Sequence, residues 1–402
     1  MFKSLEEYTS GLTDSTGIEQ IIQDLGRHVK VMYDRTVKSE QKGRILLAVQ
    51  RYNTKLDFNN PIVQVCGGIV MEYGTWKILA MPPHPANPRV KLSAIDASEY
   101  TVREINDGTM ITLYYYQNEW HLATTNGITV GSLIWLGNKT YRQVLDECLA
   151  KYPDFSFDKL KKDHSYTIGF RHPEYHPFRP STEAWFIQSY DTTNKTMNTS
   201  DIGIPEQKIV DITMDQILKL SHNADATFME QNTVNFGYVM RHKTKPMGRC
   251  SNIIIESSMM KWLKTFVYND KEGRLNAKAN DYVGAPNRLK YVALKSYLDV
   301  RHAKIFIHLF PQYQPIYDIV INFINSLASS IKNTKPEKPE KSEKTVNPYA
   351  KVIDRVVPYI VEHNRINLRS KIKESILREF LRNVVFTDEY YDYLMANDFK
   401  NV

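Results

Sequence analysis

The sequence predicts an α+β fold in which a body of mixed strands and helices is followed by an all-α C-terminal region. Residues 1–270 contain short runs of alternating apolar and polar side chains, the pattern of half-buried strands, separated by turn-forming residues. After about residue 280 the apolar period lengthens from two to about 3.6, which is the period of an amphipathic helix. A lysine-, proline- and glutamate-rich segment at 332–345 contains no apolar residue and predicts an extended linker.

Three hairpins are expected in the body, because pairs of apolar runs flank short turns. The pairs are 63–72 with 76–80, 111–116 with 120–125, and 236–241 with 252–256. A further strand is expected at 185–189. Apolar stripes at helical spacing predict short helices at 17–25, 44–52 and 140–152, and longer ones at 287–309, 317–331, 349–363 and 368–385. The expected domains are a body at 1–270, a helical extension at 271–331, a linker at 332–346 and a helical tail at 347–402.

Composition limits the classes of protein that this chain can represent. With 402 residues, 42% of them hydrophobic, it is long enough for two or three domains. No run of eighteen apolar residues exists, so no membrane partner is expected. Cys66, Cys148 and Cys250 lack CxxC spacing. A disulfide framework or a zinc ribbon is therefore not expected, and a reducing, intracellular compartment is.

The net charge of +7 arises from 52 basic residues interspersed with 45 acidic ones. An ordinary solvated surface explains such mixing, and a nucleic-acid partner remains open beside it.

Six segments carry a family resemblance through their order and spacing. Residues 66–72 read CGGIVME where the RNA ligases of phage tRNA repair have C-R-G-I-x-F-E, and residues 102–109 lie at the place of their K-x-D-G nucleophile motif. Residues 123–128 and 166–173 follow where the family has K-S-K-G-S-I and F-E-F-V-x-P. Residues 235–239 and 253–257 resemble the E-G-Y-V and F-K-I-K-S strands. The resemblance covers about residues 40–265 and implies a nucleotidyltransferase (RNA ligase-like adenylation) domain over the body.

The side chains that perform chemistry in that family are replaced here. In the family, the motif lysine attacks the α-phosphate of ATP, carboxylates hold this lysine and a metal ion, and two late lysines bind phosphate. The lysine position is Ile105, which has no lone pair with which to form a phosphoramidate. The other replaced positions are the first-strand arginine at Gly67, the carboxylates at Gly169 and Phe236, and the late lysines at Ile254 and Glu256.

These replacements predict a catalytically inactive RNA ligase-like protein that uses no cofactor and no catalytic metal. Because ligases of this family occur in phages and large DNA viruses, the resemblance implies a viral structural or assembly component, or a non-catalytic nucleic-acid binder, in a virus particle or viral factory. The alternative is an active ATP-dependent RNA ligase with a relocated nucleophile. Lys91 and Arg103 lie nearest to Ile105 in the sequence, but arginine stays protonated and Lys91 belongs to a proline-rich loop. A partial resemblance with an unrelated activity is the third possibility.

Other candidate sites each have an ordinary explanation. His172 and His176 have the spacing of a zinc-binding pair, but Pro173 and Pro177 disfavour the required helix and favour an irregular loop. Consecutive tyrosines at 114–116 could stack on bases, whereas their strand positions favour the core, above all for Tyr115.

The tail at 347–402 carries basic residues on the polar faces of its expected helices. A solvated surface explains them, and docking of other viral or assembly proteins, or of nucleic acid, remains open.

Overall fold

The computed structural model describes only part of the chain in detail. The described residues are 4–13, 15–26, 29–34, 43–49, 60–86, 90–135, 138–173, 181–198, 201–222, 236–243, 252–257 and 260, with scattered residues between 307 and 329. The chain divides into two compact units, one of Met1–Phe228 with Asn235–Trp262 and one of Met229–Val234 with Leu263–Val402. The linker and the tail expected at 332–346 and 347–402 lie outside the described residues, as does most of the extension expected at 271–331.

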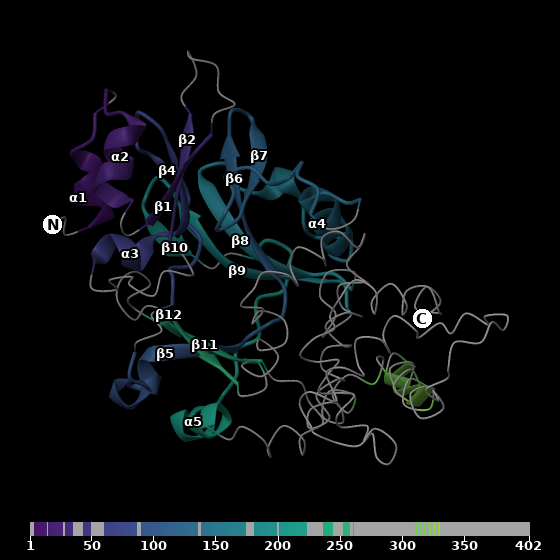
Figure 1. The fold of residues 1–402 in the computed structure, drawn as a ribbon. Coiled ribbons are helices and arrows are strands. Elements are labelled where there is room, and N and C mark those ends of the chain that lie inside the picture. Colours follow the sequence, from purple (N-terminus) through teal and green to yellow (C-terminus); the bar gives the residue numbers. More distant parts are fainter. Residues whose placement is uncertain are drawn as a thin grey trace, which may run out of the picture. The chain divides into compact units, whose positions relative to one another are not determined.

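A four-stranded antiparallel sheet begins the first unit (Figure 1), with the strand order β1-β2-β3-β4. Its strands are β1 (Val29–Tyr33), β2 (Arg44–Val49), β3 (Gly67–Glu72) and β4 (Ile78–Ala80). The helices α1 (Leu5–Ser10), α2 (Ile18–Leu25) and α3 (Pro61–Val65) cover one face. Ile45 and Leu47 pack toward these helices, while Leu46 and Ala48 pack on the opposite side. Both faces of β2 are thus buried, which explains its nearly continuous apolar sequence.

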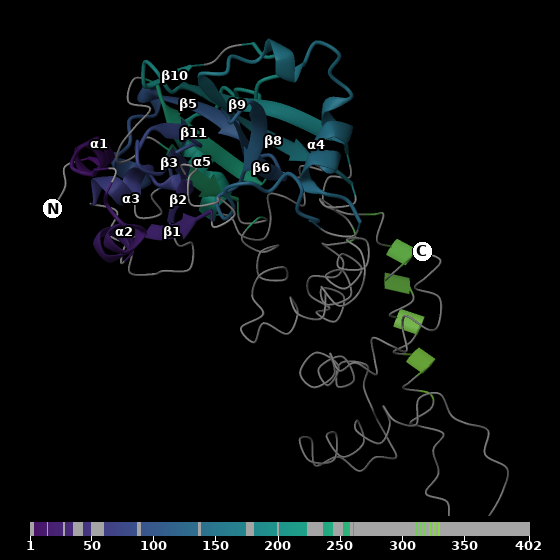
Figure 2. The same ribbon diagram turned by 90° about the horizontal axis from the view of Figure 1, so that it is seen from above.

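A five-stranded antiparallel sheet packs against that opposite side, with Val70, Tyr114 and Ala123 among the side chains between the two sheets. The strand order is β10-β9-β8-β6-β7. Its strands are β6 (Thr109–Tyr116), β7 (Glu119–Ala123), β8 (His164–Arg171), β9 (Glu183–Asp191) and β10 (Thr196–Asn198). The helix α4 (Tyr141–Leu149) covers the outer face (Figure 2) and completes a second core there. All eight residues of β8 are buried as a result.

A three-stranded antiparallel sheet, in the order β12-β11-β5, is the third sheet of the unit. Its strands are β5 (Tyr100–Glu104), β11 (Gly237–His242) and β12 (Asn252–Glu256). One face packs against α5 (Met214–His222), as Figure 1 shows, through a core that includes Val102, Tyr238 and Ile217. Two short 3₁₀ turns, η1 (Leu92–Ala94) and η2 (Ala97–Glu99), precede β5, and a third, η3 (Phe157–Lys159), precedes β8.

The segment 205–210 joins the five-stranded sheet to the three-stranded sheet. Glu206 bridges in parallel to Phe186 of β9, and Ile209 bridges in an antiparallel sense to Arg103 of β5. The amide of Val210 also donates to the carbonyl of Val102, at 3.0 Å. The edge of the five-stranded sheet is thereby tied by backbone bonds to the edge of the three-stranded one.

Two expected elements are wrong. The helix expected at 44–52 is the strand β2, whose apolar run was mistaken for one face of a helix. The first part of the strand expected at 63–72 is α3, where Asn60 caps the helix by accepting from the amide of Ile62 and Pro61 takes the first helical position. The hairpin turn at Gln117-Asn118 is confirmed, with φ of 49° and 67°, the left-handed pair of a type I′ turn.

No helix in the described part of the chain is both long and apolar enough to span a membrane.

Candidate functional site

Three of the replaced family positions lie on one face of the three-stranded sheet. The amide of Ile105 donates to the carbonyl of Gly237 at 2.9 Å, and Gly237 lies opposite Glu256 in the register. Ile254 lies opposite Val239, which in turn lies opposite Arg103. Because cross-strand partners and alternate residues share a sheet face, Ile105, Ile254 and Glu256 lie on the face away from α5. The side chain of Ile254 is 50% exposed, unusual for a strand isoleucine.

Phe236 immediately precedes this sheet and is only 1% exposed. Its carbonyl accepts a hydrogen bond from the amide of Ser257 at 3.1 Å, which holds it at the end of β12. Gly237, next to it, has φ of +123°, and a Cβ there would lie less than 3.0 Å from the carbonyl oxygen of Ile255. The glycine of the E-G-Y-V motif is thus required by the backbone, while its carboxylate has become a buried aromatic ring.

Gly169 lies in β8, on the five-stranded sheet, between Met110 of β6 and Trp185 of β9. A Cβ built on Gly169 would lie less than 3.0 Å from three atoms of the Trp185 indole. One built on Gly108, just before β6, would meet the same indole. Trp185 is 7% exposed, so its ring fills the space above both glycines. A carboxylate side chain at position 169 would therefore have to displace this indole.

At Gly67, where the family has an arginine, the neighbouring backbone likewise leaves no space for a side chain. A Cβ at Gly67 would lie less than 3.0 Å from the carbonyl oxygen of Pro83. Its neighbour Gly68 has φ of +111°, and a Cβ there would lie 3.0 Å from the Cα of Thr125. The fold therefore brings the first family motif beside the run at 123–128, although neither retains its basic side chain.

Two arginines on the same sheet face were not singled out as a pair by the sequence. Arg103 donates to the carbonyl of Gln207 and lies 3.0 Å from the carboxylate of Glu206. Arg241 donates to the carbonyl of Ile187 at 2.9 Å. Burial, and then the nearby Arg103 charge, lower the pKa of Arg241 to about 10. Both guanidinium groups bond to protein carbonyls, so they tie β5 and β11 to neighbouring segments.

The remaining candidates are dispersed. Lys91 is exposed, and its neighbours Val90 and Leu92 pack into the core on the α5 face, opposite Ile105. His172 lies 3.0 Å from Glu147, and His176 lies outside the described residues. Tyr114 and Tyr116 are buried between the two large sheets, whereas Tyr115 is half-buried beneath the ammonium group of Lys162. The expectation that Tyr115 lies in the core is wrong, because Tyr114 and Tyr116 are the residues directed between the two sheets and Tyr115 lies on the other face of β6.

No family model matches the chain. A curated protein of African swine fever virus, from a South African tick isolate and named "Putative RNA-ligase", is 27% identical over 318 residues, which are 67% of this chain and 67% of that protein. Related proteins from other isolates of the same virus match over similar spans, for example at 26% identity in a pig isolate from Kenya.

Among solved structures, the RNA ligase of Naegleria gruberi with PPi aligns at 11% identity with a TM-score of 0.31. That alignment covers 46% of this chain and 59% of the ligase, less than two thirds of its length. These values add no argument to the one from sequence. The similarity to these viral proteins, named "Putative RNA-ligase", confirms the resemblance to RNA ligases that the ordered motifs predict.

Proposed function

We propose that this protein is a catalytically inactive RNA ligase-like protein that acts as a viral structural or assembly component, or that binds nucleic acid without ligating it. The observation that carries the proposal is the position of Trp185, whose indole lies on Gly108 and Gly169. If only the side chain at position 169 were replaced, a neighbouring residue could supply the missing carboxylate. An indole in van der Waals contact with both glycines removes the space in which a substitute carboxylate would act.

The electrostatics of the sheet face support the same conclusion. Phosphate binding requires basic side chains or backbone donors directed at the anion. At the two late-lysine positions the chain carries Ile254 and Glu256, one without charge and one with a negative charge that repels a triphosphate. The two nearby guanidinium groups, of Arg103 and Arg241, are engaged with protein carbonyls.

Among the described residues, Lys91 does not support a relocated nucleophile. Lys91 is carried by a segment that packs on the α5 side of the three-stranded sheet, whereas Ile105 lies on the other face. To replace the lost lysine, its side chain would have to reach around the edge of the sheet.

The test is incubation of the full chain with ATP labelled at the α-phosphate, in Mg²⁺ or Mn²⁺, followed by denaturing electrophoresis. No protein–AMP adduct is expected. Ile105→Lys alone should also remain unlabelled, because Gly169, Phe236, Ile254 and Glu256 are unchanged. A label that resists base and is released by acid, as a phosphoramidate is, would overturn the proposal if it formed on the unaltered chain.

A second measurement separates the two non-catalytic roles. Titration of labelled single-stranded RNA and DNA at low and physiological salt reports binding without chemistry. Salt-sensitive binding favours the nucleic-acid role, and the absence of binding at low salt favours a structural or assembly role.

A further inference from the structure

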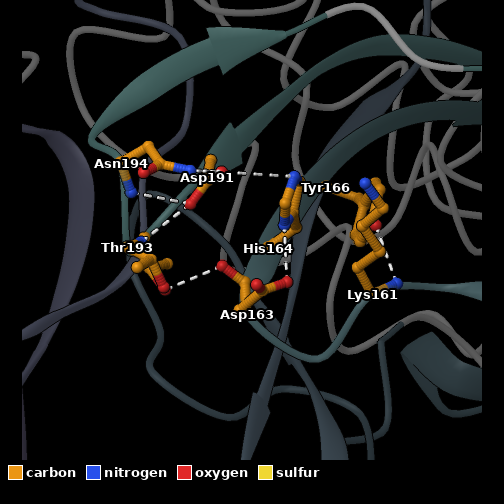
Figure 3. A network of polar contacts seen from close by, with 8 residues as sticks. Lys161, Asp163, His164, Tyr166, Asp191, Thr193 and Asn194 are labelled. Atoms are coloured by element: carbon orange, nitrogen blue, oxygen red, sulfur yellow. Dashed lines mark hydrogen bonds and ion pairs between the residues drawn. The ribbon is translucent and has the colours of Figure 1, made fainter.

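A histidine lies between two carboxylates at the end of the five-stranded sheet where β8 begins and β9 ends (Figure 3). His164 and Asp191 are direct cross-strand partners, and Asp163 immediately precedes His164. The imidazole Nδ1 lies 2.7 Å from Oδ1 of Asp163, while its Nε2 lies 3.9 Å from Oδ2 of Asp191. One ligand atom from each residue falls within 4.8 Å of the others.

The inner pair of this cluster is sheltered and held in place. The side chains of His164 and Asp191 are 7% and 10% exposed, whereas that of Asp163 is 55% exposed. The ring of Tyr166 stacks on the imidazole with its centroid 6.1 Å away. Asp191 Oδ1 accepts from the amides of Thr193 and Asn194, both at 2.8 Å, and its Oδ2 accepts from the side-chain amide of Asn194, also at 2.8 Å. The inner carboxylate is therefore fixed in position.

The arrangement of hydrogen bonds leaves two acceptors facing each other. A carboxylate at 2.7 Å from Nδ1 is a strong acceptor. In the tautomer that donates from Nδ1 to Asp163, the lone pair of Nε2 faces the carboxylate of Asp191. Two electron-rich atoms in a sheltered site repel unless a cation lies between them. A proton on Nε2 could provide it, but 3.9 Å exceeds the usual N–H···O distance of about 2.7–3.2 Å.

We propose that His164 Nε2 and Asp191 Oδ2 bind a divalent transition-metal ion of the zinc type. Zinc binds imidazole nitrogen at about 2.0–2.1 Å and carboxylate oxygen at about 2.0–2.2 Å, so an ion fits a gap of 3.9 Å with a bent N–metal–O angle. Asp163 holds the other ring nitrogen, as carboxylates do behind many metal-bound histidines. Water completes the coordination from the exposed side. The ion fastens the first residue of β8 to the last residue of β9, far along the strand from Gly169.

Thermal unfolding of the full chain provides the test, in a Cys250→Ser background that removes a competing thiol. After treatment with EDTA and its removal, Zn²⁺ is expected to raise the midpoint by about 2–4 °C, and Mg²⁺ to leave it unchanged. Asp191→Asn and His164→Gln should each abolish the zinc-dependent rise. The rise is measured against the metal-free midpoint of the same variant, so a destabilised variant remains informative.

His242→Gln is the matched control, because His242 also pairs with a carboxylate, that of Glu99 at 3.6 Å. It should retain the full zinc response, and titration calorimetry should give one ion per chain for the control and for the parent. An absent response in the parent, or an equal response in Asp191→Asn and His164→Gln, would overturn the site.

Discussion

Trp185 lies so close to Gly108 and Gly169 that a larger residue at either position has to displace its indole. Gly169→Ala places a methyl group inside the indole, which must shift within a packed core. We expect the free energy of unfolding to fall by about 1–3 kcal/mol, the usual range for overpacking. This change in the free energy of unfolding can be measured by urea denaturation, with tryptophan fluorescence as the signal.

Gly131→Ala is the control for this substitution. A Cβ at Gly131 would make ordinary contacts, with Leu122 at 3.7 Å and Arg142 at 3.9 Å. Its effect should be small. If Gly169→Ala is as mild as Gly131→Ala, the indole is not closely seated and the argument from lost space fails.

His84 gives the protein a pH-dependent stability of predictable sign. The imidazole is buried, and neither of its ring nitrogens has a hydrogen-bond partner among the described residues. Burial lowers its pKa from 6.5 to about 4. The unfolded chain therefore takes up this proton at a higher pH than the folded one, so stability is complete above pH 6.5 and falls as the pH drops toward about 4. The total loss is about 3 kcal/mol.

A His84→Leu variant tests this contribution, since leucine is close in volume and does not titrate. Urea midpoints of both proteins between pH 4 and pH 7 should show a weaker pH dependence for the variant. Identical pH profiles would mean that His84 is protonated in the folded protein or reaches solvent.

Among the helices and strands, the sequence predicts most accurately those that begin or end at a residue with a specific turn or capping preference. The Gln117-Asn118 hairpin and the helix at 140–152 are found, as β6–β7 and α4. The strand β2 was mistaken for a helix because a strand buried on both faces shows no alternation. The short strand β1 and the helix α5 were not expected. Their burial depends on partners far along the chain, which periodicity does not reveal.

The cap of α4 can be tested directly. The Thr140 hydroxyl accepts from the amide of Gln143 at 3.2 Å, and the Gln143 side chain accepts from the amide of Thr140 at 2.8 Å. Thr140→Ala removes one half of this capping box and should lower the free energy of unfolding by about 1 kcal/mol. Thr140→Ser, which keeps the hydroxyl, should be nearly neutral in the same urea titration. Equal losses in both variants would show that the methyl group of Thr140, not its hydroxyl, stabilises the helix start.

For the whole molecule, the sequence gives the order of the family positions along the chain but not which of them lie close together in space. The sequence places Ile105 more than a hundred residues before Phe236 and Ile254. Only the register of β5, β11 and β12 shows that Ile105, Ile254 and Glu256 share one sheet face. No pattern pointed to Trp185, because the steric relation of an indole to Gly108 and Gly169 arises only when β6, β8 and β9 pair.

The first compact unit should fold without the rest of the chain. Its four apolar clusters draw their buried residues from between Leu5 and Ile255. A fragment of residues 1–270 therefore contains every buried side chain of these cores and should unfold in one cooperative transition, within a few degrees of the corresponding transition of the full chain.

A fragment of residues 1–245 is the matched control, because it lacks β12. Loss of this strand exposes the edge of β11 and removes Ile253 and Ile255 from the core against α5. Burial of these two side chains contributes about 3–6 kcal/mol, a large part of the stability of an ordinary domain. The shorter fragment should therefore aggregate or unfold at a lower temperature. If the 1–270 fragment fails in the same way, residues beyond 270 complete the core, and the division of the chain near Trp262 is not a division of folding units.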